Sequence, residues 1–207
     1  MLSSILNGDI RFLVLHHTES AITATVNALC EGASSWLSQA ERSYYRSIGY
    51  KCDYHWLIDY EGNVFNPHPE TLQTFNSGDN EVNAHSIAIC CIGSYMEQRP
   101  TDKMFVSLLK TLKLVHKRYP KAVIKMHKEI VSTACPGLYY ANHVYPLLIK
   151  ADKMADWDVN AWSFPAIATL FYQGIVQGDK IKGKFYMRPR STITREEAFA
   201  LVYNTRR

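Results

Sequence analysis

Hydrophobic positions along the chain follow two patterns, one typical of buried strands and one typical of an amphipathic helix. Apolar runs over 11–16 and 85–92 predict strands, and the second is continuous enough to be central and covered on both faces. Apolar residues recur on one stripe between Thr101 or Asp102, either of which could cap a helix, and Arg118, with Pro120 beyond it. The members of that stripe are Phe105, Leu108, Leu109, Leu112 and Val115. Helices interleaved with buried strands predict an α/β fold in which helices pack on a sheet.

Weaker patterns fill the stretches between these elements. Residues 22–47 form a mainly helical pattern that ends at Gly49, and residues 66–84 are loop-like, the kind of long loop that often lines a site. A strand over 54–59 followed by a turn at 60–63 and Val64–Phe65 predicts a hairpin. The candidate buried positions of the helical stretch are Ile22, Val26, Leu29, Trp36 and Leu37.

A change in pattern near Asp152 divides the chain into predicted domains at 1–150 and 151–207. In the second part an amphipathic helix beginning near Ala161 is stopped by glycines, and Thr194 with Glu197 forms a capping box for a last helix. Residues 180–207 hold eight Lys or Arg and two Glu, a charge of +6, whereas the remainder holds 15 basic and 17 acidic residues, or −2. A solvated tail or a nucleic-acid patch would also be basic, but interleaved apolar residues favour a small folded helical module aimed at an anionic polymer, with no nucleic-acid partner.

Length and composition exclude several classes of protein. The 207 residues, 47% of them hydrophobic, allow one catalytic domain plus a small second unit. No apolar run approaches the roughly 20 residues of a membrane span. The first residues lack a basic region and a long apolar region, so we expect no secretory signal and synthesis in the cytoplasm. Five cysteines, two of them adjacent core residues (Cys90 and Cys91), do not predict a disulfide framework.

Three residues are candidate metal ligands. His16 ends the apolar run 11–16, His127 ends the apolar stretch 122–127, and Cys135 follows just before Pro136-Gly137. Imidazole and thiolate are ligands that zinc prefers, and three protein ligands leave a position open for water, as in catalytic zinc sites. Taken singly, the same residues are more often two core histidines and an inert buried cysteine.

Four motifs, taken in their order along the chain, resemble those of a known family and favour the metal-ligand interpretation over the core-residue one. They are Leu13-Val-Leu-His-His-Thr, Asp53-Tyr-His-Trp-Leu-Ile-Asp-Tyr-Glu-Gly, Asn83-Ala-His-Ser-Ile-Ala-Ile, and His127 with Cys135-Pro-Gly. In this order they closely resemble the type 2 N-acetylmuramoyl-L-alanine amidases, a family that includes phage endolysins and peptidoglycan recognition proteins, over about residues 8–150. The resemblance implies a central mixed β-sheet flanked by helices. It also implies a Zn²⁺ hydrolase that cuts peptidoglycan between muramic acid and the first alanine of the stem peptide.

The resemblance also assigns roles to individual residues. It makes His16 the ligand rather than His17, and strand alternation agrees that only one of two neighbours reaches the metal. It implies that Tyr54 stabilises the oxyanion or assists proton transfer, and that Thr133 stands where the phage branch has a lysine. His17, Thr18 and Asn83 are the expected substrate contacts within this region.

Some positions depart from the family pattern or stay open. The loop over 76–79 lacks the Ala-His pair often found there in the family, so substrate contacts from it are not predicted. His17, His55 and His85 could shuttle protons, although core or surface roles are the commoner ones for such residues.

The C-terminal part resembles one S-layer homology motif over about 153–207. The pattern is Trp162, Gly-Ile-Val-x-Gly over 174–178, Phe185 with Pro189, and Ile193-Thr-Arg-Glu-Glu. The resemblance implies binding of an acidic secondary cell-wall polysaccharide, with Arg195 as the best candidate contact because its planar fork pairs two anionic oxygens. The alternative is a helical appendage that only stabilises the amidase.

These features together predict a phage-type endolysin that reaches the bacterial wall with the help of a holin and lyses the host cell. A non-catalytic peptidoglycan-binding protein is the alternative from another class, and Cys135 argues against it because non-catalytic members typically lack that cysteine. A cytosolic muropeptide-recycling amidase is a third reading, for which a wall-binding module would have no use.

Overall fold

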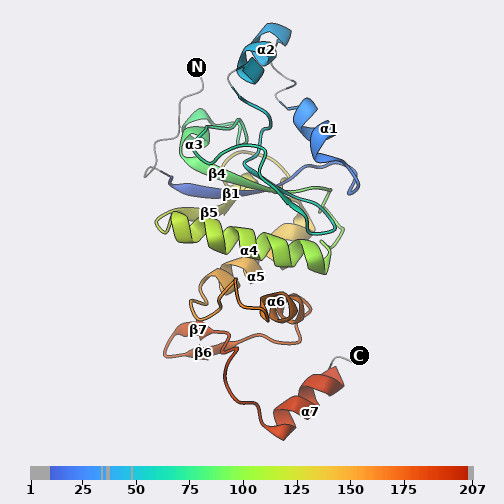
Figure 1. Cartoon of the computed structure of the whole chain (residues 1–207), viewed down its shortest axis with the longest axis vertical. Coiled ribbons are helices and arrows are strands. Elements are labelled where there is room, and N and C mark those ends of the chain that lie inside the picture. The colour runs from blue at the N-terminus through green and yellow to red at the C-terminus, as the bar shows by residue number, and fades with distance from the viewer. Residues whose placement is uncertain (1–9, 34, 36–37, 48, 205–207) are drawn as a thin grey trace.

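The computed structural model describes residues 10–33, 35, 38–47 and 49–204. Figure 1 shows the parts of the chain stacked along its long axis, from α1 (Val26–Glu31) and α2 (Gln39–Ser47), through a sheet and a long helix, to α7 (Arg195–Asn204) near the C-terminus. Of the predicted buried positions in the helical stretch, Trp36 and Leu37 lie outside the described residues.

A five-stranded mixed sheet forms the centre of the molecule, as predicted. Its order is β3 (Val64–Phe65), β2 (Trp56–Ile58), β4 (Ser86–Cys91), β1 (Phe12–His17) and β5 (Val123–Met126). All neighbouring pairs are parallel except β2 and β3, which form the predicted antiparallel hairpin. The apolar runs occupy the two central strands, where both faces of the sheet are covered, and every residue of β4 is buried.

Helix α4 (Asp102–Arg118) covers one face of this sheet (Figure 1). The side chain of Thr101 caps it by accepting a hydrogen bond from the backbone N–H of Met104 at 3.1 Å. The predicted apolar stripe is buried in full and packs against the residues of β1 and β4 that point to the same side. Those residues are Leu13, Leu15, Ile87, Ile89 and Cys91.

The opposite face is covered more loosely, and here the sequence-based expectation was partly wrong. The stretch 22–47 holds two short helices, α1 and α2, in keeping with its mainly helical pattern, but neither helix has a buried residue. Its apolar residues Val26 and Leu29 pack, half-buried, on a small cluster of Cys52, Leu57, Cys90 and Ile92. A cluster of this size cannot bury a whole helix stripe, so these helices stay at the surface.

A short helix also lies inside the stretch predicted to be a loop. Helix α3 (Asn80–Ala84) is capped by Asp79, whose side chain accepts from the backbone N–H of Val82 at 3.0 Å. This helix supports the segment next to the candidate metal ligands, because its Asn83 accepts hydrogen bonds from the N–H groups of Asn76 and Ser77.

The core on the α4 side continues past the predicted domain boundary at residue 151. A 3₁₀ turn (His127–Glu129) and a π-helical turn (Tyr140–Val144) lead into α5 (Tyr145–Asp152), and α6 (Phe164–Tyr172) then packs on α4. The rings of Phe105 and Tyr172 are stacked 4.1 Å apart at 2°, and Trp157, Phe164 and Phe171 join the same cluster. Residues 151–172 therefore share one core with α4, and a separate C-terminal module remains a prediction only beyond α6.

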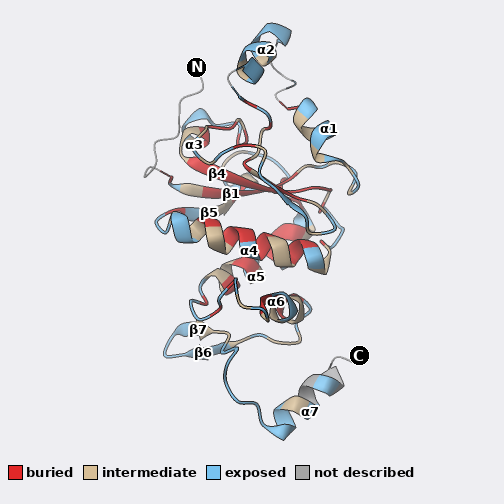
Figure 2. Cartoon of the chain, in the orientation of Figure 1, coloured by how far each residue is buried: buried red, intermediate tan, exposed pale blue. Residues whose placement is uncertain are grey.

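The chain beyond α6 is mostly exposed (Figure 2). It consists of a hairpin, β6 (Asp179–Ile181) with β7 (Lys184–Tyr186), and then α7. The predicted capping box begins α7, with Thr194 and Glu197 exchanging hydrogen bonds of 2.7 and 3.2 Å.

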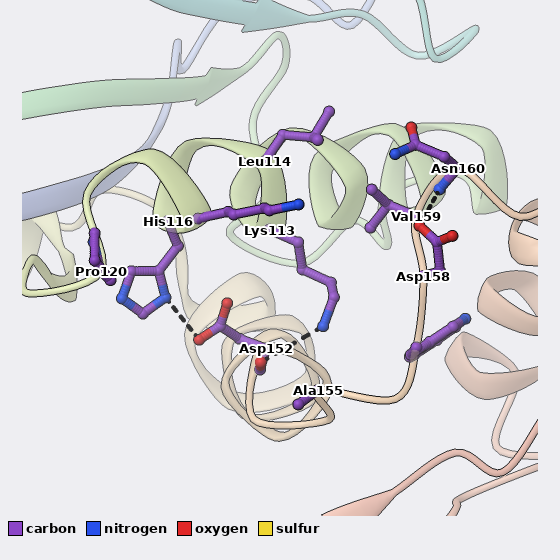
Figure 3. A pocket seen from close by; sticks show the side chains of 11 residues that line it. Lys113, Leu114, His116, Pro120, Asp152, Ala155, Asp158, Val159 and Asn160 are labelled. Carbon is purple, nitrogen blue, oxygen red and sulfur yellow. Dashed lines mark hydrogen bonds and ion pairs between the residues drawn. The ribbon is translucent and has the colours of Figure 1, made fainter.

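A cavity of about 630 Å³ lies between α4 and the segment 152–160 (Figure 3). It contains the hydrogen bond between His116 and Asp152, whose atoms Nδ1 and Oδ2 are 2.8 Å apart. The cavity is on the far side of α4 from the sheet and does not contact the candidate metal ligands. Among the helices of the described residues, none combines the length and the apolar character needed to cross a bilayer.

Candidate metal centre

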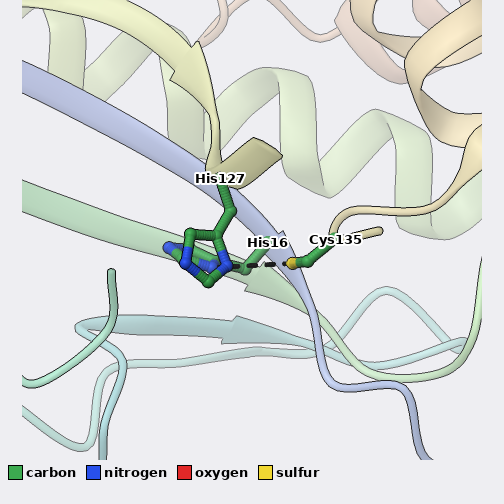
Figure 4. A group of neighbouring side chains, drawn as sticks. All are labelled: His16, His127 and Cys135. Carbon is green, nitrogen blue, oxygen red and sulfur yellow. Dashed lines mark hydrogen bonds between the residues drawn. The ribbon is translucent and has the colours of Figure 1, made fainter. Parts of the chain in front are cut away.

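The three predicted ligands come together at the carboxyl edge of the sheet. His16 lies near the end of β1, and His127 directly follows β5, the parallel neighbour of β1. Their ring centroids are 4.6 Å apart, and His16 Nδ1 lies 3.7 Å from Cys135 Sγ (Figure 4). One ligand atom from each of the three residues lies within 4.8 Å of the others, a spacing at which one ion can contact all three.

The loop that carries Cys135 is held tightly against the sheet. The Cys135 N–H donates to Thr133 Oγ1 at 3.2 Å, and the Lys128 N–H donates to the Cys135 carbonyl at 2.9 Å. Gly137 has a φ of +99°, and a Cβ there would lie 2.3 Å from the backbone carbonyl of Tyr95. Only glycine permits this approach, which explains the glycine in the Cys-Pro-Gly motif.

The hydrogen bonds of the two histidines leave their Nδ1 atoms facing the candidate centre. His127 Nε2 lies 3.1 Å from the Ser77 carbonyl, and His16 Nε2 lies 3.2 Å from Asn76 Oδ1. Both partners are oxygen acceptors, so each Nε2 carries the proton and each Nδ1 keeps its lone pair.

Burial sets the protonation of the three groups. It lowers the pKa of His16 and of His127, so both rings are neutral at pH 7, as metal ligands must be. Burial also raises the pKa of the Cys135 thiol to about 12, although the sulfur accepts a hydrogen bond from the His17 N–H at 3.3 Å. A thiolate here needs a nearby cation, and two neutral imidazoles with one thiolate are a donor set that fits zinc.

Tyr54 lies beside this group. Its ring centroid is 5.3 Å from that of His16. Burial raises its pKa well above the ordinary value, so the hydroxyl keeps its proton at neutral pH and can donate a hydrogen bond.

Thr18 and Thr133 are both at the rim of the site, and both use their hydroxyls to hold backbone. Thr18 Oγ1 accepts from the Gly93 N–H at 2.9 Å, which joins the ends of β1 and β4. Thr133 is exposed, and its hydroxyl accepts the hydrogen bond from Cys135 described above.

Two predicted binding residues lie elsewhere than expected. His17 points to the α4 face of the sheet and is 3% exposed, with Nδ1 accepting from the Tyr95 N–H at 3.1 Å. Asn83 is 2% exposed and lies beneath the loop 76–79. We correct both expectations, because a side chain buried in this way cannot contact a large polymer. Arg195, the residue predicted to contact a wall polymer, is exposed on α7, away from the sheet that carries the candidate centre (Figure 1).

His55 is also a core residue in the structure. Its Nδ1 accepts from the Ala88 N–H at 3.0 Å and its Nε2 donates to the Leu72 carbonyl at 2.8 Å, so both nitrogens are used. The residues that the sequence reasoning missed are Asn76 and Ser77, the partners of the two histidines. The cluster of short polar residues before Asp79, a helix cap, was the available signal.

Comparisons with known proteins agree with this geometry. The family model described as N-acetylmuramoyl-L-alanine amidase matches residues 6–138. A comparison with curated proteins found no match.

Solved structures of amidases and of recognition proteins share the fold. The endolysin of Thermus scotoductus bacteriophage Ph2119 is 22% identical, with a TM-score of 0.55, over 72% of this chain and 88% of its own. The N-acetylmuramoyl-L-alanine amidase LysC of Clostridium intestinale is 24% identical, with a TM-score of 0.52, over 67% of this chain and 83% of its own. Drosophila PGRP-LB is 17% identical, with a TM-score of 0.53, over 66% of this chain and 79% of its own.

The family match covers more than half of the chain, and the cluster of His16, His127 and Cys135 lies within the matched residues. The chain therefore belongs to the N-acetylmuramoyl-L-alanine amidase family.

Proposed function

We propose that this protein is a zinc-dependent N-acetylmuramoyl-L-alanine amidase that hydrolyses the amide between muramic acid and L-alanine in bacterial peptidoglycan. The observation that carries the proposal is the convergence of His16, His127 and Cys135 within 4.8 Å, in a chain of the amidase family. Three ligands, rather than four, favour catalysis over a purely structural metal.

The residues of the site would have separate roles in the reaction. His16 and His127 would hold the metal through Nδ1, and Cys135 would hold it as a thiolate. Zinc, when bound, supplies a Lewis acid that activates water at neutral pH and polarises a carbonyl. The protonated hydroxyl of Tyr54 would donate to the oxygen of the scissile amide as negative charge develops there. Thr133 carries no charge, so stabilisation of the negative charge on the amide oxygen would depend on the metal and Tyr54 more than on Thr133.

The principal alternative is a protein with the same fold that binds peptidoglycan without cutting it. Recognition proteins are among the structurally similar proteins, so the fold alone is compatible with either function. The complete set of three ligands favours the enzyme.

The place of action follows from the same proposal. We infer that the protein acts on the bacterial cell wall as a phage-type endolysin, with a holin as the export partner. The basic segment 180–207, in which Arg195 is exposed, would bind an anionic secondary wall polysaccharide. Fixed cations suit such a polymer, and their effect should weaken with salt over a screening length of roughly 8–10 Å.

Zinc content and bond cleavage, measured together, test the proposal. Purified wild-type protein should hold one zinc per chain and release muramic acid from stem peptides. Cys135→Ser should lose most of both, because the alcohol does not replace a thiolate ligand. Cys30→Ser is the matched control, since Cys30 is half-buried in α1 and lies outside the ligand cluster. A Cys135→Ser protein with stoichiometric zinc and full activity would contradict the ligand assignment, and a zinc-loaded wild type that binds but never cuts walls would favour the alternative.

A further inference from the structure

Both candidate histidine ligands are hydrogen bonded to one two-residue segment, Asn76–Ser77. His16 Nε2 meets the side-chain oxygen of Asn76 at 3.2 Å, and His127 Nε2 meets the backbone carbonyl of Ser77 at 3.1 Å. The two histidines come from different elements, β1 and the 3₁₀ turn after β5, so this segment is the point at which their orientations are coupled.

Toward the two imidazole rings the segment presents only acceptor oxygens, and this determines which nitrogen of each ring holds the proton. A backbone carbonyl cannot donate, so His127 must donate from Nε2. The Asn76 amide is fixed in direction because its Nδ2 donates to Thr74 Oγ1 at 3.0 Å, which turns Oδ1 toward His16. Both rings are thereby held as the tautomer whose Nδ1 can bind a metal.

Asn83 holds the segment in place from below. Its Oδ1 accepts three hydrogen bonds, from the N–H of Asn76 at 3.0 Å, the N–H of Ser77 at 2.9 Å and the hydroxyl of Ser77 at 2.8 Å. Asn76, Ser77 and Asn83 are all buried, and Asn83 lies on α3, which Asp79 caps. Buried hydrogen bonds of this kind are costly to break, so the segment is rigid where the two rings meet it.

We propose that Asn76 and Asn83 are positioning residues that set the tautomer and the orientation of His16 and His127, and thereby the affinity of the site for its metal. The proposal rests on the proposed function, since it takes both histidines to be zinc ligands. Asn76 acts directly on His16, and Asn83 acts on His127 through the carbonyl of Ser77. Outer partners of this kind commonly contribute about 10–100-fold in metal affinity.

Variants of Asn76 separate positioning from general stability. Asn76→Leu has a similar size but no acceptor for His16, whereas Asn76→Asp keeps the acceptor. The matched control is Asn66→Leu, because Asn66 holds the same long loop by donating to the carbonyls of His55 and His68 at 2.7 and 2.9 Å without touching either ligand. Asn83→Ala tests the second interaction, in which Asn83 acts on His127 through the carbonyl of Ser77.

Two measurements on the full chain give the answer. The first is the zinc dissociation constant, obtained by competition with a chelator. We expect it to rise about 10–100-fold in Asn76→Leu and Asn83→Ala, and to stay within a few-fold of wild type in Asn76→Asp and Asn66→Leu. The second is the ¹⁵N–¹H correlation spectrum of the histidine rings in the metal-free protein. Wild type should show both rings protonated at Nε2, Asn76→Leu should lose this preference at His16 alone, and Asn83→Ala should lose it at His127.

The outcomes distinguish this proposal from the proposed function. A wild-type chain that binds no zinc overturns the zinc enzyme, while the ring spectra still show whether Asn76 and Asn83 set the tautomers. If zinc binds and Asn76→Leu changes neither the dissociation constant nor the His16 tautomer, the positioning role is wrong and the enzyme stands. Equal losses of affinity in Asn66→Leu and Asn76→Leu would likewise overturn it, because they would reduce the effect to loop stability.

Discussion

Tyr54 is the residue at which binding and catalysis can be separated most cleanly. Its ring packs beside His16 and its hydroxyl stays protonated at neutral pH. Tyr54→Phe keeps the packing and removes only the donor, so we expect kcat to fall about 10²–10³-fold with the zinc content unchanged. Tyr44→Phe, on the exposed surface of α2, is the control. An unchanged kcat in a zinc-loaded Tyr54→Phe protein would remove the hydroxyl from the mechanism.

Gly137 allows the ligand loop to approach the sheet, and its substitution should affect both folding and metal binding. A Cβ at this position meets the Tyr95 backbone at 2.3 Å, and the φ of +99° is unfavourable for any other residue. We expect Gly137→Ala to lower the free energy of unfolding by about 3–5 kcal/mol and to weaken zinc binding, because Cys135 must move.

Gly49→Ala is the matched control for that prediction. Gly49 has a similar φ of +93°, but nothing lies within 4 Å of the Cβ that would be added. Thermal unfolding should therefore show a loss of only about 1–2 kcal/mol and no change in zinc content. Equal effects of the two substitutions would mean that backbone strain, and not the approach to Tyr95, makes Gly137 necessary.

The candidate ligands could be predicted from the sequence, whereas the residues that orient them could not. His16, His127 and Cys135 are chemically distinctive and belong to ordered motifs. Asn76 and Ser77 act through an amide and a backbone carbonyl, in a stretch that reads only as a polar loop. His17 and Asn83 were misread for a related reason, since a sequence does not show that a polar side chain is buried beside a site and not within it.

Glu70 links two elements, because its carboxylate contacts both β2 and the end of α4. It accepts from Trp56 Nε1 at 2.8 Å and forms an ion pair with Arg118. Burial raises the pKa of Glu70, but the hydrogen bonds from Arg118 and Trp56 outweigh this and lower it below 4.5. A lowered pKa means that the ionised group stabilises the fold above about pH 4.5, and that this contribution is lost as the pH falls through the folded-state value.

Glu70→Gln should therefore destabilise the protein only where the carboxylate is ionised. We expect a loss of about 1–2 kcal/mol at pH 7, reduced by the partial exposure of Arg118, and a smaller difference from wild type below pH 4. Thermal unfolding across this pH range measures it. A difference that stays constant with pH would show that the charge of Glu70 is unimportant.

At the scale of elements, the sequence predicted the strands and helices that pack on the core more closely than those at the surface. The strands β1 and β4 and the helix α4 were predicted closely, because their apolar patterns correspond to extensive contacts on the core. The stretch 22–47 has enough apolar residues to suggest one helical region, but the surface available to it is the small cluster around Cys52 and Leu57. The extent of that surface depends on strands from other parts of the chain, so no local pattern reveals it.

At the scale of the whole molecule, the position of the core decides which C-terminal truncations are tolerated. A chain ending at Lys150 loses Trp157, Phe164, Phe171 and Tyr172, all of which pack with α4. Each large aromatic residue removed from a core costs about 3–5 kcal/mol, so the sum exceeds the usual stability of a domain. We expect this truncated chain to be insoluble or to lack cooperative unfolding.

A chain ending at Gln177 keeps α6 and should behave differently. It should unfold cooperatively and still cleave small soluble muropeptides, while sedimenting poorly with whole walls at low salt because the whole basic segment 180–207 is gone. Sedimentation equal to that of the full chain would mean that the segment beyond α6 does not bind the wall. A soluble, active chain ending at Lys150 would contradict the shared core.

The strand order of the sheet has a consequence for how the protein is made. Among the strands of the described residues, β1 is synthesised first, yet it pairs with β4, at residues 86–91, and β5, at residues 123–126. Such parallel pairings between distant segments form slowly, because the intervening chain must be ordered before they gain anything. The growing chain therefore cannot complete its central sheet until β5 has left the ribosome. His16 is therefore made long before Cys135, and the three candidate ligands cannot come together until that cysteine has also emerged.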